Sequence, residues 1–207
     1  MQTCYRQSML RKYLTYGLLL GSLSLSVPAH ADEADAQYRK GLASMQAGKL
    51  EEAQASLEEA LRQRPNYAAA ELTLGNVLRK LKKCDKAIPH YEAVIRLQPQ
   101  DPFAYGNLGF CYSLVGRNPE AVAALTKATE LSPNEVQWRM SLGAALNHEK
   151  KYAEALPHLE KAVQLDPNNP NALRNLGGEV SVVDNIDGGA TAILTHPLDL
   201  SRVAVLA

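Results

Sequence analysis

Several features that mark common functional classes are scarce in this sequence. Basic residues do not outnumber acidic ones, because the 207 residues include 22 of each. The sequence has no basic stripe of the kind that predicts a nucleic-acid partner. After residue 27 no long apolar run predicts a helix that would span a membrane. These absences argue against a nucleic-acid-binding protein and against a membrane domain.

Motifs for metal binding and catalysis are also missing. His148 and Glu149 could begin a His-Glu-x-x-His zinc helix, but Tyr152 occupies the position of the second histidine. His90 and His158 lie 68 residues apart and are not expected to share a metal. No Gly-x-Ser-x-Gly motif occurs, and no glycine-rich phosphate loop follows a predicted strand. We therefore predict no metal site, no cofactor and no enzymatic activity.

Residues 1–31 have the organisation of a secretory signal peptide. The features are a basic start, an uncharged apolar stretch and small residues at a cleavage point, supplied by Arg6, Arg11 and Lys12, by 13–27, and by Ala29 and Ala31. We predict cleavage after Ala31 and a periplasmic or secreted protein of a Gram-negative bacterium. The alternative is an uncleaved membrane anchor, but the apolar stretch is shorter than the roughly 20 residues of a span. No stable membrane insertion is expected after cleavage.

Cleavage would leave a chain of 176 residues, which is enough for one domain. Three basic residues leave with the signal segment, so 19 basic and 22 acidic residues remain. The mature protein is therefore expected to be slightly acidic, with a net charge near −3.

One pattern recurs along the rest of the chain at a fixed spacing. A Leu-Gly pair occurs at 74–75, 108–109 and 142–143, in steps of 34 residues. Prolines close successive copies at the same spacing, at Pro65, Pro99, Pro133 and Pro167. The copies cover 34–67, 68–101, 102–135 and 136–169, and a partial fifth copy begins at residue 170. This period and the residues that recur with it resemble the tetratricopeptide repeat family.

The residues of one copy predict two packed helices. Leu108 and Tyr112 are four residues apart, so they share one face of the first helix. Gly109 lies beside them and has no side chain. We expect Ala121 and Ala128 of the second helix to pack closely against it, because larger side chains would overpack the crossing.

The connection between the two helices has its own signals. Gly116 suits a residue that leaves the first helix with a positive φ angle, and Lys82 occupies the same position in the second copy. Asn118, Pro119 and Glu120 then predict an N-cap, a proline at the first helical position and an acid in the first turn.

The resemblance implies an all-α fold, a right-handed α-solenoid of helix-turn-helix repeats over 32–178. The first copy is degenerate, since Lys40 stands where later copies have leucine, as expected for an end repeat without an upstream neighbour. We predict an irregular C-terminal tail over 179–207. Its β-branched residues and its turn signal at 187–189 are compatible with a short hairpin. The other two alternatives are a poorly ordered tail and a sequence altered from an original repeat.

Two cysteines remain in the mature chain. Cys84 falls at the start of the second helix of copy two, and Cys111 falls late in the first helix of copy three. Antiparallel packing of these helices would bring the two levels together, and an exported protein meets conditions that permit disulfides. A disulfide is one hypothesis, and two small buried hydrophobic side chains are the other.

The resemblance also implies a binding groove, because family ligands usually lie against the concave surface made by the first helices. The matching positions here are Tyr38, Leu72, Asn76, Arg79, Phe103, Asn107, Phe110, Met140 and Asn147. Some family members hold a terminal carboxylate with Lys, Asn and Arg; Asn76 and Asn107 match, but the other positions hold Leu72, Gln137 and Ser141. A carboxylate clamp is therefore not expected. The competing interpretation is that several of these residues only pack against the next repeat.

We therefore predict an exported scaffold that binds a partner protein or peptide in the groove, with a role in the cell envelope. The alternative is an accessory or regulatory domain of an envelope enzyme or assembly whose catalytic part is a separate chain. Self-association through the unfinished C-terminal repeat is a further hypothesis.

Overall fold

The computed structural model describes residues 29–177, 180–184 and 190–194. The predicted signal segment lies outside these residues up to position 28. Within the described ranges the chain forms nine helices and two strands: α2 (Ala29–Gln46), α3 (Leu50–Gln63), α4 (Ala68–Lys80), α5 (Cys84–Leu97), α6 (Pro102–Leu114), α7 (Asn118–Leu131), α8 (Val136–His148), α9 (Tyr152–Leu165), α10 (Pro170–Gly177), β1 (Val180–Asp184) and β2 (Ala190–Leu194).

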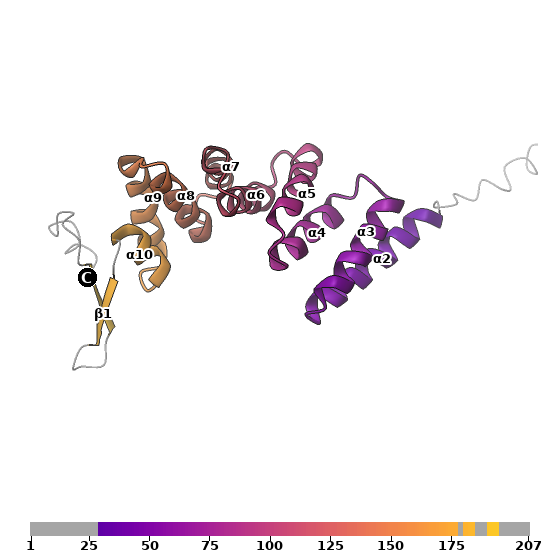
Figure 1. Cartoon of the computed structure of the whole chain (residues 1–207), viewed down its shortest axis with the longest axis horizontal. Helices are drawn as coiled ribbons and strands as arrows, with labels where there is room; N and C mark the ends of the chain where they lie inside the picture. The colour runs from indigo at the N-terminus through magenta and orange to yellow at the C-terminus, as the bar shows by residue number, and fades with distance from the viewer. Residues whose placement is uncertain (1–28, 178–179, 185–189, 195–207) are drawn as a thin grey trace, which may run out of the picture.

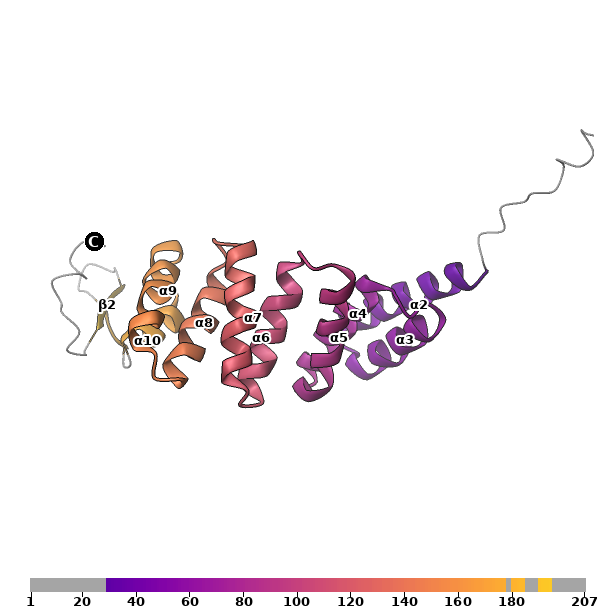
Figure 2. The same cartoon turned by 90° about the horizontal axis from the view of Figure 1, so that it is seen from above.

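The helices form successive antiparallel pairs, and the pairs follow one another along the long axis of the molecule (Figures 1 and 2). Helices α2 and α3, α4 and α5, α6 and α7, and α8 and α9 correspond to the four predicted copies. Each second helix also packs against the first helix of the next pair. This arrangement is the predicted right-handed α-solenoid.

One packing contact recurs inside every pair. A Cβ atom added at Gly109 would lie 2.5 Å from Leu125 Cγ and 3.1 Å from the Ala121 carbonyl oxygen. The same contact, between a glycine and the residue 16 positions later, occurs for Gly41 and Leu57, Gly75 and Tyr91, and Gly143 and Leu159. The glycine is therefore required for the close approach, as predicted. Its nearest neighbours in the second helix are Leu125 and the backbone at Ala121, however, and Ala128 is not among them.

The four turns within the repeats share one geometry although their sequences differ. Gly48 and Gly116 have φ angles of 76° and 79°, and Lys82 and Lys150 have φ angles of 59° and 60° at the equivalent positions. In each turn the next residue donates a backbone hydrogen bond of 2.9 Å to the carbonyl group five residues earlier. This bond closes the first helix with a left-handed residue. Lysine thus adopts the conformation in which glycine would cost less.

The helix starts differ from the prediction at one site. Asn118 is the first residue of α7 rather than its N-cap, and Arg117 takes the cap position without a side-chain hydrogen bond. Asp101 caps α6 instead, because its carboxylate accepts hydrogen bonds from the backbone N–H groups of Phe103 (2.8 Å) and Ala104 (3.0 Å). This cap fixes the start of the helix that carries both phenylalanines.

Replacing Asp101 with alanine is expected to lower the free energy of unfolding by about 1 kcal/mol, because two N–H groups at the start of α6 lose their acceptor. Glu135 is the matched control, since it takes the same position before α8 and makes no side-chain cap bond. Urea unfolding of the two alanine variants checks the prediction. Equal losses for both would show that the Asp101 cap contributes nothing.

The C-terminal end departs from the helical repeat. Helix α10 begins a fifth copy, and it packs on α9 and α8. The strands β1 and β2 then pair antiparallel, with Val180 opposite Leu194 and Asp184 opposite Ala190. Among the three alternatives for the C-terminal tail, the antiparallel pairing of the two described strands fits the short hairpin. Figure 1 shows it beside α10.

Among the helices that the structure describes, none combines the length and the apolar character needed to cross a membrane.

Candidate partner-binding groove

The first helices of the pairs form the inner side of the curve. Consecutive first helices contact one another, from α2 and α4 through to α8 and α10. Over the described helices, consecutive second helices make no such contact. The first helices are therefore closer together than the second helices, and they line the concave surface on which the predicted groove residues lie.

A hydrogen-bonded group connects α4, α5 and α6 at the middle of this surface. The Asn76 side-chain oxygen accepts bonds from the Tyr91 hydroxyl (3.0 Å) and from the Asn107 amide (3.2 Å). Burial raises the pKa of Tyr91 above its usual value, and the neighbouring Cys111 adds to this rise, so the hydroxyl stays protonated as a donor. The two predicted asparagines therefore meet directly, and Tyr91 fixes the orientation of the Asn76 amide.

The predicted Arg79 and Phe110 are neighbours across α4 and α6. The guanidinium carbon of Arg79 lies 5.5 Å from the centre of the Phe110 ring, within the range of a cation–π contact. Arg79 Nε is buried and has no hydrogen-bond partner within the described part of the chain. The ring and the cation thus form one partly buried unit at the edge of the Asn76–Asn107 pair.

Phe103, at the start of α6, is the most exposed of the nine predicted groove residues. It is 57% exposed. The centre of its ring lies 5.4 Å from the centre of the Trp138 ring in α8, in an edge-to-face arrangement. Trp138 is buried and lies directly against Gly106, where a Cβ atom would collide with the indole. Trp138 was not among the predicted groove residues. The signal was available, because it is the sole tryptophan in the chain and Gly106 lies inside a helix, where glycine is costly.

The structure contradicts the predicted groove position of one residue, Met140. Met140 is only 5% exposed and belongs to a small core with Ala162, Val163 and Ala172. It packs between α8, α9 and α10 and presents almost no surface to a partner. The prediction that it lines the groove is therefore wrong for this structure.

The remaining predicted residues, Tyr38, Leu72 and Asn147, are partly buried. The Tyr38 ring lies 5.0 Å from the ring of Tyr67, and Leu72 packs against the main core. Asn147 donates a hydrogen bond of 3.3 Å to the backbone oxygen of Asn175 in α10. The Asn147 bond joins repeat four to α10, whereas the Tyr38 and Tyr67 rings meet within repeat one. The competing interpretation of packing against the next repeat is therefore supported for Asn147.

Gln137 and Ser141 occupy two of the positions that a carboxylate clamp would use. The Gln137 amide lies 3.5 Å from the Ser141 hydroxyl on the exposed side of α8. Neither residue carries a positive charge. The described residues contain no group of three or more metal-ligating side chains. The surface can therefore offer aromatic contacts, amide hydrogen bonds and one arginine.

The two cysteines meet at the boundary of repeats two and three. Their sulfur atoms lie 2.6 Å apart, and both residues are buried free thiols in this structure. The predicted proximity is thus present, without a covalent bond.

A family model described as "Tetratricopeptide repeat" matches residues 38–102 and 115–170, and a second model with the same description matches residues 90–123. The chain belongs to the tetratricopeptide repeat family. The two models together span repeats one to four, which carry a Leu-Gly pair in repeats two to four and Lys40-Gly41 in repeat one.

Curated relatives cover part of this tetratricopeptide repeat array. Hsp70-Hsp90 organizing protein 2 of Arabidopsis thaliana is 36% identical over 83 residues, which are 40% of this chain and 14% of that protein. The mitochondrial import receptor subunit TOM70 of Saccharomyces cerevisiae is 39% identical over 72 residues, which are 35% of this chain and 12% of that protein. The matches therefore span a small part of these longer proteins.

Solved structures resemble the array over a larger share of its length. A MamA fragment from Desulfovibrio magneticus is 28% identical with a TM-score of 0.62, covering 66% of this chain and 77% of that one. YrrB, described as "a TPR protein with an unusual peptide-binding site", is 27% identical with a TM-score of 0.64, covering 68% and 73%. The PilF protein of Pseudomonas aeruginosa is 25% identical with a TM-score of 0.62, covering 72% and 68%.

Proposed function

We propose that this protein is a scaffold that binds a segment of a partner protein on the concave surface of α4, α6 and α8. The observation that carries the proposal is Phe103, a large aromatic side chain that is 57% exposed on this surface. Exposed aromatic residues in a shaped groove are frequent anchors for a partner, because burying them removes much apolar area from water.

The polar residues on the same surface fit a peptide backbone. Arg79 holds its charge next to the Phe110 ring and retains an unpaired Nε. Asn76 and Asn107 are partly exposed and spend only some of their hydrogen-bonding capacity on each other. A bound segment with an apolar side chain over Phe103 and with carbonyl or carboxylate oxygens near Arg79 would satisfy both parts of the surface.

The relatives support the same class of function. The Hsp70-Hsp90 organizing proteins carry names that indicate work on other proteins, and YrrB is described with a peptide-binding site. This chain lacks the full set of residues for a carboxylate clamp, since Leu72, Gln137 and Ser141 occupy three of the positions. The proposed partner is therefore recognised through an internal apolar segment rather than through a free C-terminus.

Selection of short random peptides on the immobilised full-length chain tests the proposal. We expect the enriched peptides to share an apolar anchor, and to slow the hydrogen exchange of α4, α6 and α8 when they bind. Protection confined to the outer helices α5, α7 and α9 would place binding on the wrong surface, and no enrichment at all would contradict a peptide-binding role.

We also propose that the protein is exported to the cell envelope after cleavage between Ala31 and Asp32. The support is the basic start, the apolar stretch and the small residues before this point. N-terminal sequencing of the protein from a periplasmic fraction is expected to begin at Asp32. Ala31→Leu is expected to block or shift cleavage because the site needs a small residue. A mature chain that still begins at Met1 would refute the proposal.

A further inference from the structure

Cys84 and Cys111 come from different repeats and meet in the interior. Cys84 is the first residue of α5, and Cys111 lies in α6. Their exposed fractions are 5% and 0%, and their sulfur atoms lie 2.6 Å apart. A disulfide bond is about 2.05 Å long, so a small movement of either side chain brings the sulfurs to bonding distance.

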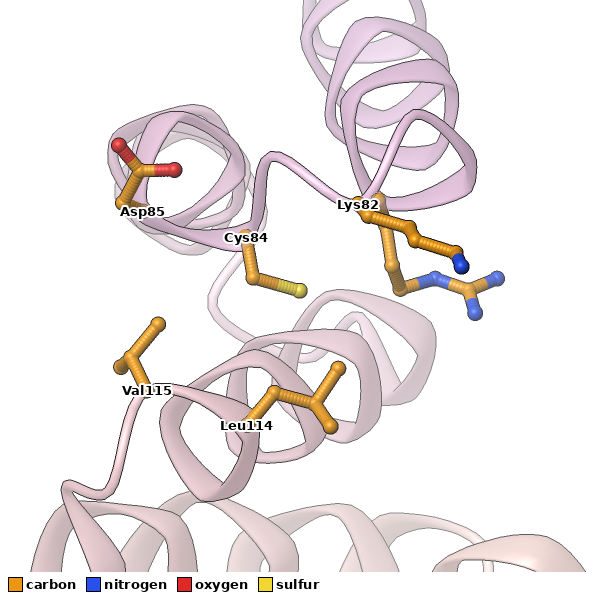
Figure 3. Close-up of a pocket in the computed structure, with 6 residues that line it drawn as sticks. Lys82, Cys84, Asp85, Leu114 and Val115 are labelled. Carbon is orange, nitrogen blue, oxygen red and sulfur yellow. The ribbon is translucent and has the colours of Figure 1, made fainter.

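A cavity of about 520 Å³ opens beside this pair (Figure 3). It is lined by Arg79, Lys82, Cys84, Asp85, Leu114 and Val115. Figure 3 shows the Cys84 sulfur pointing into the space between Lys82 and Leu114. Cys111 does not line the cavity. An incoming molecule would therefore meet Cys84 first.

We propose that Cys84 and Cys111 are an oxidation site, at which a small disulfide such as oxidised glutathione enters the cavity and converts the two thiols to a disulfide that joins repeats two and three. The cavity shares Arg79 with the proposed binding groove. The two thiols and the disulfide between them use none of the groove side chains Phe103, Asn76 or Asn107, so oxidation can be measured separately from the binding of a partner.

The reaction balances as two thiol–disulfide exchanges. The Cys84 thiol loses its proton to water, and its sulfur attacks one sulfur of the small disulfide. A mixed disulfide forms on Cys84, and the other half leaves and takes up a proton as a free thiol. Cys111 then loses its proton and attacks the Cys84 sulfur, which releases the second half as a thiol. The protein loses two protons and two electrons, which together are two hydrogen atoms, and the small disulfide gains them as it becomes two thiols.

The surroundings of the two sulfurs support this order. Burial raises the pKa of the Cys111 thiol above its usual value, and the hydrogen bond with Cys84 contributes to the rise. Cys111 is therefore a slow nucleophile toward outside reagents, since the thiolate is the reactive form. Once Cys84 carries the mixed disulfide, the attack occurs within one molecule, where proximity compensates for the small thiolate fraction.

The disulfide would act at the boundary between repeats two and three. In a repeat array each repeat packs only on its neighbours, and α5 and α6 form the main contact between repeats two and three. A covalent bond across this contact restricts the unfolded chain and prevents the two halves from separating. We expect oxidation to raise the melting temperature by roughly 5–10 °C.

Treatment of the reduced full-length Cys4→Ser chain with oxidised glutathione tests the proposal. Mass spectrometry is expected to show the loss of two hydrogen atoms, and digestion should yield one linked pair of peptides containing Cys84 and Cys111. The Cys111→Ala variant should stop at a stable adduct with one glutathione, while the Cys84→Ala variant should remain largely unmodified.

The route through the cavity has a separate test that does not alter the cysteines. Leu114 is 63% exposed at the cavity, so Leu114→Trp should fill the space and slow oxidation about tenfold. Leu97→Trp, at an exposed leucine outside the cavity lining, should leave the rate unchanged. Two glutathione adducts without an internal disulfide, a disulfide-linked dimer, or fast modification of Cys84→Ala would each overturn the proposal.

Discussion

Replacing Phe103 with alanine is expected to weaken binding of a groove-selected peptide by at least about tenfold, which corresponds to about 1.4 kcal/mol. The physical reason is that the ring is 57% exposed in the free protein and would be buried by the peptide. Phe110→Ala is expected to have an effect of the same size, because the ring holds Arg79 in place. Titration of a labelled peptide, with melting temperatures of both variants, measures the effect.

Tyr152→Ala is the matched control for the loss of an exposed aromatic ring. Tyr152 is 63% exposed and begins the second helix α9, on the outer side of the curve. Its replacement should leave peptide affinity unchanged. A loss of stability near the 3–5 kcal/mol of a core Phe→Ala change, with no specific loss of affinity, would show that Phe103 and Phe110 only pack the repeats together.

Replacing Gly109 with leucine is expected to lower the free energy of unfolding by about 3 kcal/mol, at the upper end of the usual cost of overpacking. The new Cβ atom would lie 2.5 Å from Leu125 Cγ and 3.1 Å from two backbone atoms of α7, the Ala121 oxygen and the Leu125 nitrogen. A side chain can rotate away, but the backbone atoms move only if the whole helix moves. Urea unfolding followed by circular dichroism measures the change.

Ala123→Leu is the control for the added apolar group, because Ala123 lies exposed on the same α7 helix. It should change the free energy of unfolding by less than about 0.5 kcal/mol. If Gly109→Leu is equally mild, the two helices of a repeat do not approach as closely as the structure describes, and the recurring glycine has another cause.

The sequence by itself determined the repeat and its helical character. Leu-Gly pairs and closing prolines at one fixed spacing are local signals, and each describes a helix face or a helix end without reference to distant residues. The same spacing located the first helices, and all nine predicted groove residues do lie on them. The two cysteines were also placed at the same level correctly, because the period fixes how far each lies along its helix.

The tertiary structure alone decided which neighbours those residues have. Trp138 lies against Gly106 from the next repeat, and Met140 turns into a small core completed by α9 and α10. Both outcomes depend on side-chain volumes contributed by other helices, which a local pattern does not contain. Lys82 adopts a left-handed conformation for the same reason, since the packed helices on either side require that turn whatever residue occupies it.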